Sequence, residues 1–102
     1  MEQWCVYFIR CGPVKIGRTT DLMNRLKDLQ VGNPYELNIL FTLPCSSLEH
    51  SMKLERFLHR QLYNKFHVRG EWFIVDSRVS ITKLIDKFNT SHSHLFDEKV
   101  VK

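Results

Sequence analysis

The sequence lacks the features that mark membrane-spanning, secreted and zinc-binding proteins. Its apolar runs, such as "CVYFI" at residues 5–9, are far too short to span a bilayer, and no basic segment followed by a long apolar stretch indicates a secretion signal. The only cysteines are Cys5, Cys11 and Cys45, and none belongs to a CxxC pair. This spacing argues against a zinc finger and favours free thiols, so we expect an intracellular, cytoplasmic protein with no membrane partner.

Negative charge is scarce in the first two thirds of the chain. Residues 1–70 carry ten Lys and Arg against six Asp and Glu, whereas residues 71–102 carry five of each. The net charge of +4 therefore belongs to the first part of the chain. Such a surplus suits a polyanionic partner, although many soluble proteins carry a similar charge.

The length of 102 residues, with 43% hydrophobic residues and no low-complexity tract, predicts one domain with one modest core. We expect this domain to cover residues 1–89. The polar stretch over residues 90–102 is expected to be a flexible tail.

The residue patterns predict the order β-β-α-β-α-β-α, which is an α+β fold with helices on a mostly antiparallel sheet of three to four strands. Residues 4–10 have apolar side chains on both alternating faces, which is typical of a central strand. The other predicted elements are a returning strand at 14–17, a helix at about 21–30, a strand at 36–43, a helix from Pro44 to about Tyr63, a short edge strand at 71–75 and a final helix with Ile81, Leu84, Ile85 and Phe88 on its core face.

Short polar residues are expected to cap these helices. Thr19 or Thr20 is predicted to cap the first helix, and Asp76 or Ser77 the last. In the long helix, Ser46 and Glu49 have the spacing of a capping box. Its apolar face is expected to contain Leu48, Met52, Leu58 and Leu62.

Charged residues interrupt the apolar faces of the first two helices. Arg25 lies at the edge of the stripe formed by Leu22, Leu26 and Leu29. In the long helix, Glu55 and His59 fall one turn apart within the apolar face. An inward carboxylate needs a cation, a metal or hydrogen-bond donors, so Glu55 pairs with a core-side arginine or binds a hard divalent cation.

The other candidate residues also allow a structural and a chemical role. Arg25 serves Glu55 or a strand carbonyl, or it binds a phosphate through its planar guanidinium. Tyr7 is core, or its hydroxyl reaches a cleft and moves a proton. Lys15 is solvated or lowers a neighbour's pKa, and His59 is a hydrogen-bonded helix residue or a base. Glu71 and Trp72 begin the edge strand or support the site.

The combination resembles the GIY-YIG nuclease superfamily over about residues 4–76. "CVY" at residues 5–7 occupies the place of GIY, "KIG" at 15–17 that of YIG, and "RTTDLMNRL" carries the arginine at Arg25. "LERFLHRQL" is similar to the family's metal-binding helix and assigns Glu55. "RGEWFIV" at 69–75 resembles a compact branch found in phages and large viruses, where lysine often replaces the second tyrosine. A viral source would place the protein in a host cell.

The resemblance implies hydrolysis of DNA phosphodiester bonds with one divalent cation, Mg²⁺ or Mn²⁺, and no small-molecule cofactor. Glu55 would hold the ion, Tyr7 would help to activate water, and Arg25 would stabilise the transition state. Lys15 and His59 are candidate catalytic residues by position. Glu71 falls in the region of an asparagine that these enzymes often use, and Trp72 lies beside it. The basic residues predicted to contact double-stranded or branched DNA are Arg18, Lys27, Arg56 and Arg69.

The sequence departs from the GIY-YIG pattern at three positions. Cys5 replaces the first glycine, Lys15 replaces the second tyrosine, and Leu29 stands where many members carry histidine or tyrosine. A catalytically inactive module that binds nucleic acid or a protein is therefore the alternative to an enzyme. The sequence is also compatible with a homodimer or with binding to a protein partner.

Overall fold

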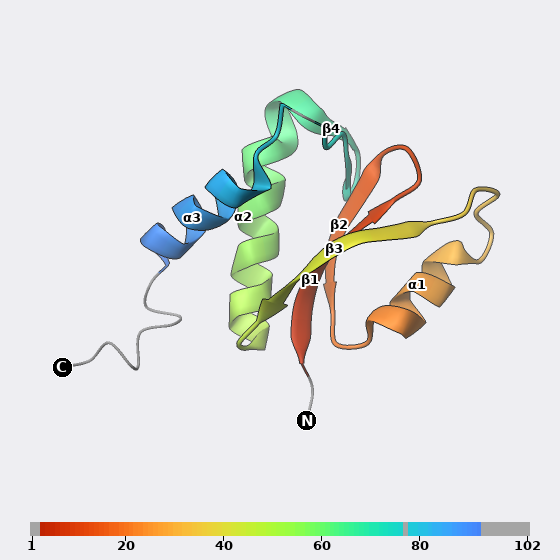
Figure 1. Cartoon of the computed structure of the whole chain (residues 1–102), viewed down its shortest axis with the longest axis horizontal. Helices are drawn as coiled ribbons and strands as arrows, with labels where there is room; N and C mark the ends of the chain where they lie inside the picture. The colour runs from red at the N-terminus through yellow and green to blue at the C-terminus, as the bar shows by residue number, and fades with distance from the viewer. Residues whose placement is uncertain (1–2, 77, 93–102) are drawn as a thin grey trace.

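The computed structural model describes residues 3–76 and 78–92, in which strands and helices are interspersed along the chain (Figure 1). This arrangement confirms the predicted α+β class. The elements are β1 (Trp4–Arg10), β2 (Val14–Thr19), α1 (Leu22–Gln30), β3 (Asn38–Cys45), α2 (Leu48–Phe66), β4 (His67–Arg69), β5 (Trp72–Phe73) and α3 (Ile81–Ser91).

The strands form one sheet in the order β3-β1-β2-β5-β4, and every neighbouring pair is antiparallel. β1 lies inside the sheet, as its two apolar faces predict. Val6 and Phe8 are buried on the face covered by α2 and α3, whereas Tyr7 and Ile9 are buried on the face covered by α1. The sheet is therefore the middle of three layers, with α1 on one side and α2 and α3 on the other (Figure 1).

The short strands near Gly70 differ from the prediction. The expected edge strand at 71–75 contains only Trp72 and Phe73, and it lies between β2 and β4 instead of at an edge. β4 was not predicted, because three residues are too few for an alternating pattern. Gly70 joins the two strands with a φ of 54°, a left-handed conformation that favours glycine.

β3 is also displaced from its predicted range of 36–43. It ends at Cys45 and includes Pro44, which was expected to open the long helix. Proline is tolerated in β3 because β3 is an edge strand of the sheet.

The helix caps lie slightly downstream of the predicted residues. Asp21 caps α1 and Ser47 caps α2, so the predictions of Thr19 or Thr20 and of Ser46 are wrong. In each case the side-chain oxygen accepts the backbone N–H at the third helical position. Leu48 then falls in the first turn of α2 and is exposed, not part of the core.

α3 starts later and ends later than expected. Its cap is Ser80, while Asp76 binds Arg78 through hydrogen bonds and an ion pair. Ser77, the other predicted cap, lies outside the described residues. α3 continues to Ser91, two residues into the stretch at 90–102 that was predicted to be a tail, and residues 93–102 lie outside the described part.

Because β5 is short, the C-terminal part of β2 has no strand beside it on the side away from β1, which leaves an open edge in the sheet. β5 pairs with Val14 and Lys15, and the carbonyl of Glu71 accepts the N–H of Ile16, after which this ladder ends. Gly17 comes next and lies opposite Tyr7 in the β1–β2 register. A Cβ built at Gly17 would lie 2.6 Å from Cζ of Tyr7. The missing side chain therefore gives the tyrosine ring its place at this open edge.

We predict that Gly17→Ala lowers the free energy of unfolding by about 1–3 kcal/mol, because the added methyl group overlaps a buried ring. Urea denaturation measures this cost. In a Tyr7→Ala background the ring is absent, so the same substitution should cost little. An equal cost in both backgrounds would contradict the role assigned to Gly17.

Candidate functional site

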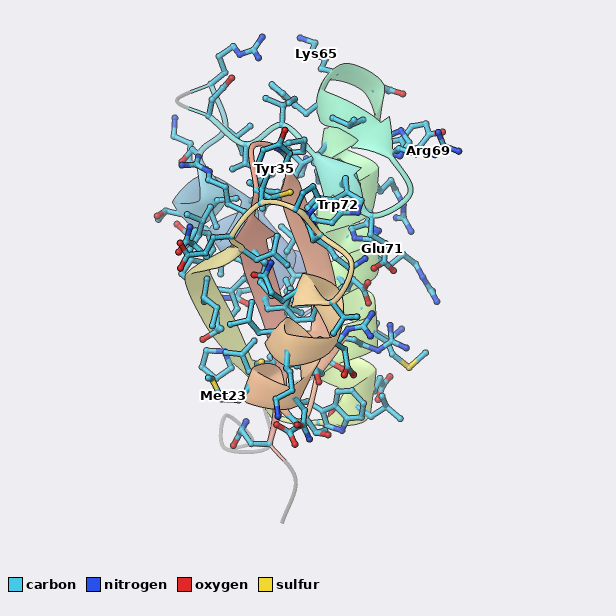
Figure 2. The ribbon with its side chains drawn as sticks, turned by 90° about the vertical axis from the view of Figure 1, so that its right-hand side faces the viewer. Met23, Tyr35, Lys65, Arg69, Glu71 and Trp72 are labelled. Atoms are coloured by element: carbon cyan, nitrogen blue, oxygen red, sulfur yellow. The ribbon has the colours of Figure 1, made fainter. Side chains whose placement is uncertain are left out.

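A cleft of about 280 Å³ lies at the open edge of β2, and residues from both faces of the sheet line it. Its lining comes from β1, β2, α1, α2 and the turn before β5. Figure 2 shows Glu71 next to Trp72 on this side of the molecule. The lining residues are Trp4, Tyr7, Arg18, Arg25, Glu55 and Glu71.

Glu55 lies in this cleft with its carboxylate almost fully buried. Its relative exposure is 6%, as its place on the apolar face of α2 predicts. Arg18 Nη1 donates to Glu55 Oε1 at 2.5 Å, and His59 Nε2 lies 3.8 Å from Oε2. The arginine partner considered from the sequence therefore exists, but it comes from β2 and had been assigned to nucleic acid.

Arg25 and Tyr7 form the opposite wall. Arg25 Nε donates to the Tyr7 hydroxyl at 3.2 Å, and this hydrogen bond raises the pKa of Arg25. Arg25 does not pair with Glu55. Its two terminal nitrogens have no hydrogen-bond partner among residues 3–76 and 78–92, so they can bind a ligand in the cleft.

Lys15 holds the second carboxylate of the site. Lys15 Nζ donates to Glu71 Oε1 at 2.9 Å and lies 5.7 Å from the ring centroid of Trp72. Partial burial raises the pKa of Glu71, but the hydrogen bond and charge of Lys15, together with His59 and Glu55, hold the pKa below its usual value of 4.5. Lys15 and Trp72 thus position Glu71 without lining the cleft themselves.

His59 is held by the backbone. Its Nε2 lies 2.8 Å from the carbonyl oxygen of Ile16, and its ring packs on Phe73 at 4.9 Å. Because a carbonyl only accepts, Nε2 is the donor in this hydrogen bond, and it is then not free to take a proton. Of the two roles considered for His59, this geometry favours a hydrogen-bonded structural residue over a catalytic base.

The remaining predicted DNA contacts lie outside the cleft. Lys27 is exposed on α1 and lines a separate hollow of about 590 Å³ with Met23 and Leu26. Arg56 is exposed on α2, beside Glu55 in sequence. Arg69 is exposed on β4, and Figure 2 shows it projecting on the α2 side of the molecule.

Two residues of the site were missed or misassigned from the sequence. Trp4 lines the cleft from the start of β1 and had no assigned role. Arg18 directly follows the Ile-Gly pair, so the end of β2 carried a signal for a residue at the site. Its partner could not be found, because Glu55 is 37 residues away in the chain.

The cleft contains two carboxylates that are candidate ligands for a hard divalent cation. Within the described residues, no group of three His, Cys, Asp or Glu side chains is close enough to hold a metal. Glu55 and the neighbouring Glu71 offer carboxylate oxygens, and Mg²⁺ commonly binds one or two carboxylates while keeping several waters. All three cysteines are free, and burial raises the pKa of Cys45 to about 11.

The fold and the site together define a small α+β domain with a charged cleft suited to a phosphate group. The chain belongs to the T5orf172 domain family, which matches residues 5–96. This is a phage-associated, nuclease-type domain with a nuclease-like or DNA-binding function. The comparisons found no match among curated proteins and none among solved structures. Within the described residues, none of the helices is both long and apolar enough to cross a bilayer.

We predict that the Lys15–Glu71 pair stabilises the protein in a pH-dependent way. Because the native pKa of Glu71 lies below 4.5, the unfolded chain binds more protons than the native chain in the range just below that value. The stabilisation is therefore present above this range and is lost as the pH falls through the native pKa. Glu71→Gln and Lys15→Met should each flatten this part of the profile, as measured by urea unfolding between about pH 3 and 6 with a chelator present. An unchanged profile in both variants would show that the pair contributes no such stability.

Proposed function

We propose that the protein is a metal-dependent endonuclease that hydrolyses DNA phosphodiester bonds by a GIY-YIG-type mechanism with one Mg²⁺ or Mn²⁺ ion. One observation carries this proposal. Tyr7, Arg25 and Glu55 come from β1, α1 and α2, yet they line the same open cleft. Arg25 and Glu55 are not paired with each other, so each can act on a ligand between them.

The pairing of the two motifs supports this assignment. "CVY" and "KIG" lie on adjacent antiparallel strands, and their key residues Tyr7 and Gly17 are direct partners. The tyrosine hydroxyl therefore reaches the cleft although the residue is only 1% exposed.

Glu55 would hold the cation at the floor of the cleft, with Glu71 as a second carboxylate nearby. A bound divalent ion supplies Lewis-acid polarisation of the phosphate and stabilises the leaving oxygen. Burial of Glu55 and its hydrogen bond from Arg18 hold the carboxylate in place before any ligand binds.

Tyr7 and Arg25 would act on the nucleophile and on the phosphate. The Tyr7 hydroxyl accepts from Arg25, so its own proton and its remaining lone pair are available to a water in the cleft. The terminal nitrogens of Arg25 can donate to two phosphate oxygens, which stabilises the extra negative charge of the transition state.

A catalytically silent DNA-binding module is the second candidate, and the Arg18–Glu55 contact favours it. At 2.5 Å, the guanidinium occupies one oxygen of the carboxylate and offsets the negative charge that would attract a cation. In an active enzyme, an ion on Glu55 would compete with Arg18 for the charge of this carboxylate, and a displaced Arg18 could bind the DNA backbone.

We predict that the protein nicks supercoiled plasmid with Mg²⁺ or Mn²⁺ and that Glu55→Gln abolishes nicking while leaving DNA binding in place. Arg25→Ala should lower turnover by about 10²-fold or more, because it removes a preorganised electrostatic stabiliser. Agarose gels measure nicking, and fluorescence anisotropy measures binding.

Lys83→Ala is the control for Arg25, since it removes one positive charge from an exposed position on α3, outside the cleft. It should change turnover by less than about threefold. Nicking that persists unchanged in Glu55→Gln would refute the assignment of Glu55. Binding without nicking in the unmodified protein would favour the silent module.

We further predict that Arg18→Gln binds Mn²⁺ roughly twofold to fivefold more tightly in the absence of DNA, because the ion no longer competes with a guanidinium for Glu55. Isothermal titration calorimetry measures this affinity without depending on activity. Arg56→Gln is the control, since Arg56 follows Glu55 on α2 but is exposed and has no ion-pair partner among the described residues. Weaker binding in Arg18→Gln would instead show that Arg18 orients Glu55 for the ion.

A further inference from the structure

A second hollow lies on α2 near the cleft. It has a volume of about 410 Å³, and we call it the α2 groove. Its lining residues are Arg56, His59, Arg60, Tyr63 and Asn64. The groove adjoins the cleft at His59, whose Nε2 lies 3.8 Å from Glu55 Oε2.

Helical spacing arranges the groove as two parallel stripes. Glu55, His59 and Tyr63 follow one another at intervals of four residues, so they share one stripe of α2. Arg56 and Arg60 form the neighbouring stripe. At a rise of 1.5 Å per residue, Tyr63 lies about 12 Å along the helix axis from Glu55. A chain that leaves the cleft along α2 therefore passes the arginines on one side and the tyrosine on the other.

The charge of this region is uniformly positive. Residues 56–70 contain the cations Arg56, Arg60, Lys65 and Arg69 and no Asp or Glu. Within the described residues, none of these cations takes part in an ion pair or a side-chain hydrogen bond. Figure 2 shows Lys65 at the C-terminal end of α2 and Arg69 on the adjoining hairpin. Their charge is thus available to an anionic partner.

Tyr63 adds a flat aromatic surface to this positive groove. Its ring stacks on His67 at 4.3 Å with an interplanar angle of 23°, yet the residue is 58% exposed. His67 is itself held by a hydrogen bond to the Gly70 carbonyl at 2.9 Å and by packing on Phe73. Tyr63 is therefore a supported ring, and its exposed surface can stack with another planar group.

We propose that the α2 groove binds unpaired single-stranded DNA next to the scissile phosphate, with one base stacked on Tyr63. A positively charged groove with an exposed aromatic ring is the arrangement that binds single strands. Paired bases are stacked on each other inside a duplex, so an exposed tyrosine face gains little from them. The preferred substrate is then DNA with a single-stranded branch or overhang. This inference rests on the proposed function, since it defines the substrate of the same cleft.

The test compares two DNA probes with a chelator present, so that no cutting occurs. One probe is a blunt duplex, and the other is the same duplex with an overhang of about ten deoxythymidines, within the site size of single-strand binders. We expect tighter binding of the overhang probe, measured by fluorescence anisotropy. Tyr63→Ala should weaken binding of the overhang probe about tenfold and change that of the blunt duplex by less than twofold, since loss of one stacked base has about this effect.

Matched variants separate stacking from loss of structure. Tyr63→Phe keeps the ring and should retain the affinity of the unmodified protein. Tyr35→Ala removes a tyrosine of similar exposure, 70%, from the loop after α1 and should have no effect on either probe. A 2-aminopurine placed in the overhang should be quenched by the unmodified protein and by Tyr63→Phe but not by Tyr63→Ala. Arg60→Gln should reduce the slope of log affinity against log salt by about one.

Several outcomes would overturn the proposal. These are equal affinity for the two probes, an equal loss for both probes in Tyr63→Ala, or no loss in that variant. Tighter binding of a matching RNA overhang would overturn the assignment to DNA. Glu55→Gln separates this inference from the proposed function: it should bind the overhang normally while failing to cut. Cutting that depends on Glu55 but not on Tyr63 would refute only the groove.

Discussion

The absence of a side chain at Gly17 is the constraint on which the site depends. The Tyr7 ring crosses β2 at this residue, and any Cβ there would overlap it. Because β5 stops pairing with β2 one residue earlier, the same point is an open edge of the sheet. Side chains from the α1 face and from the α2 face can therefore meet around one glycine. A longer β5 would cover this edge and separate Tyr7 from Glu55.

The charges in the cleft are balanced in pairs, with one cation in excess. Arg18 binds Glu55, and Lys15 binds Glu71. Within residues 3–76 and 78–92, the only side-chain partner of Arg25 is the Tyr7 hydroxyl, so no carboxylate in the cleft neutralises its charge by direct contact. An excess cation on the wall of an open cleft attracts a phosphate and remains in place when the phosphate gains charge. The two ion pairs keep the carboxylates oriented in the meantime.

α2 links the cleft to the surface beyond it. Its inner face supplies Leu58 and Leu62 to the larger core, while the stripe through Glu55, His59 and Tyr63 leads from the cleft to the exposed groove. One helix therefore fixes the distance between the carboxylate and the aromatic ring. The β4–β5 hairpin supports this stripe, since Phe73 packs against His59 and against His67, on which Tyr63 stacks.

The sequence by itself determined the α+β class, the interior position of β1, the inward direction of Glu55 and the place of Arg25 at the edge of its helix stripe. These features follow from periodicities of two and about four residues, which are local properties of the chain. The sequence did not reveal the caps at Asp21, Ser47 and Ser80, because neighbouring polar residues compete for the same role. Only the tertiary structure decided that Arg18 binds Glu55 and that Lys15 binds Glu71. These partners are 37 and 56 residues apart, and they meet because strand order and register bring distant segments to one edge.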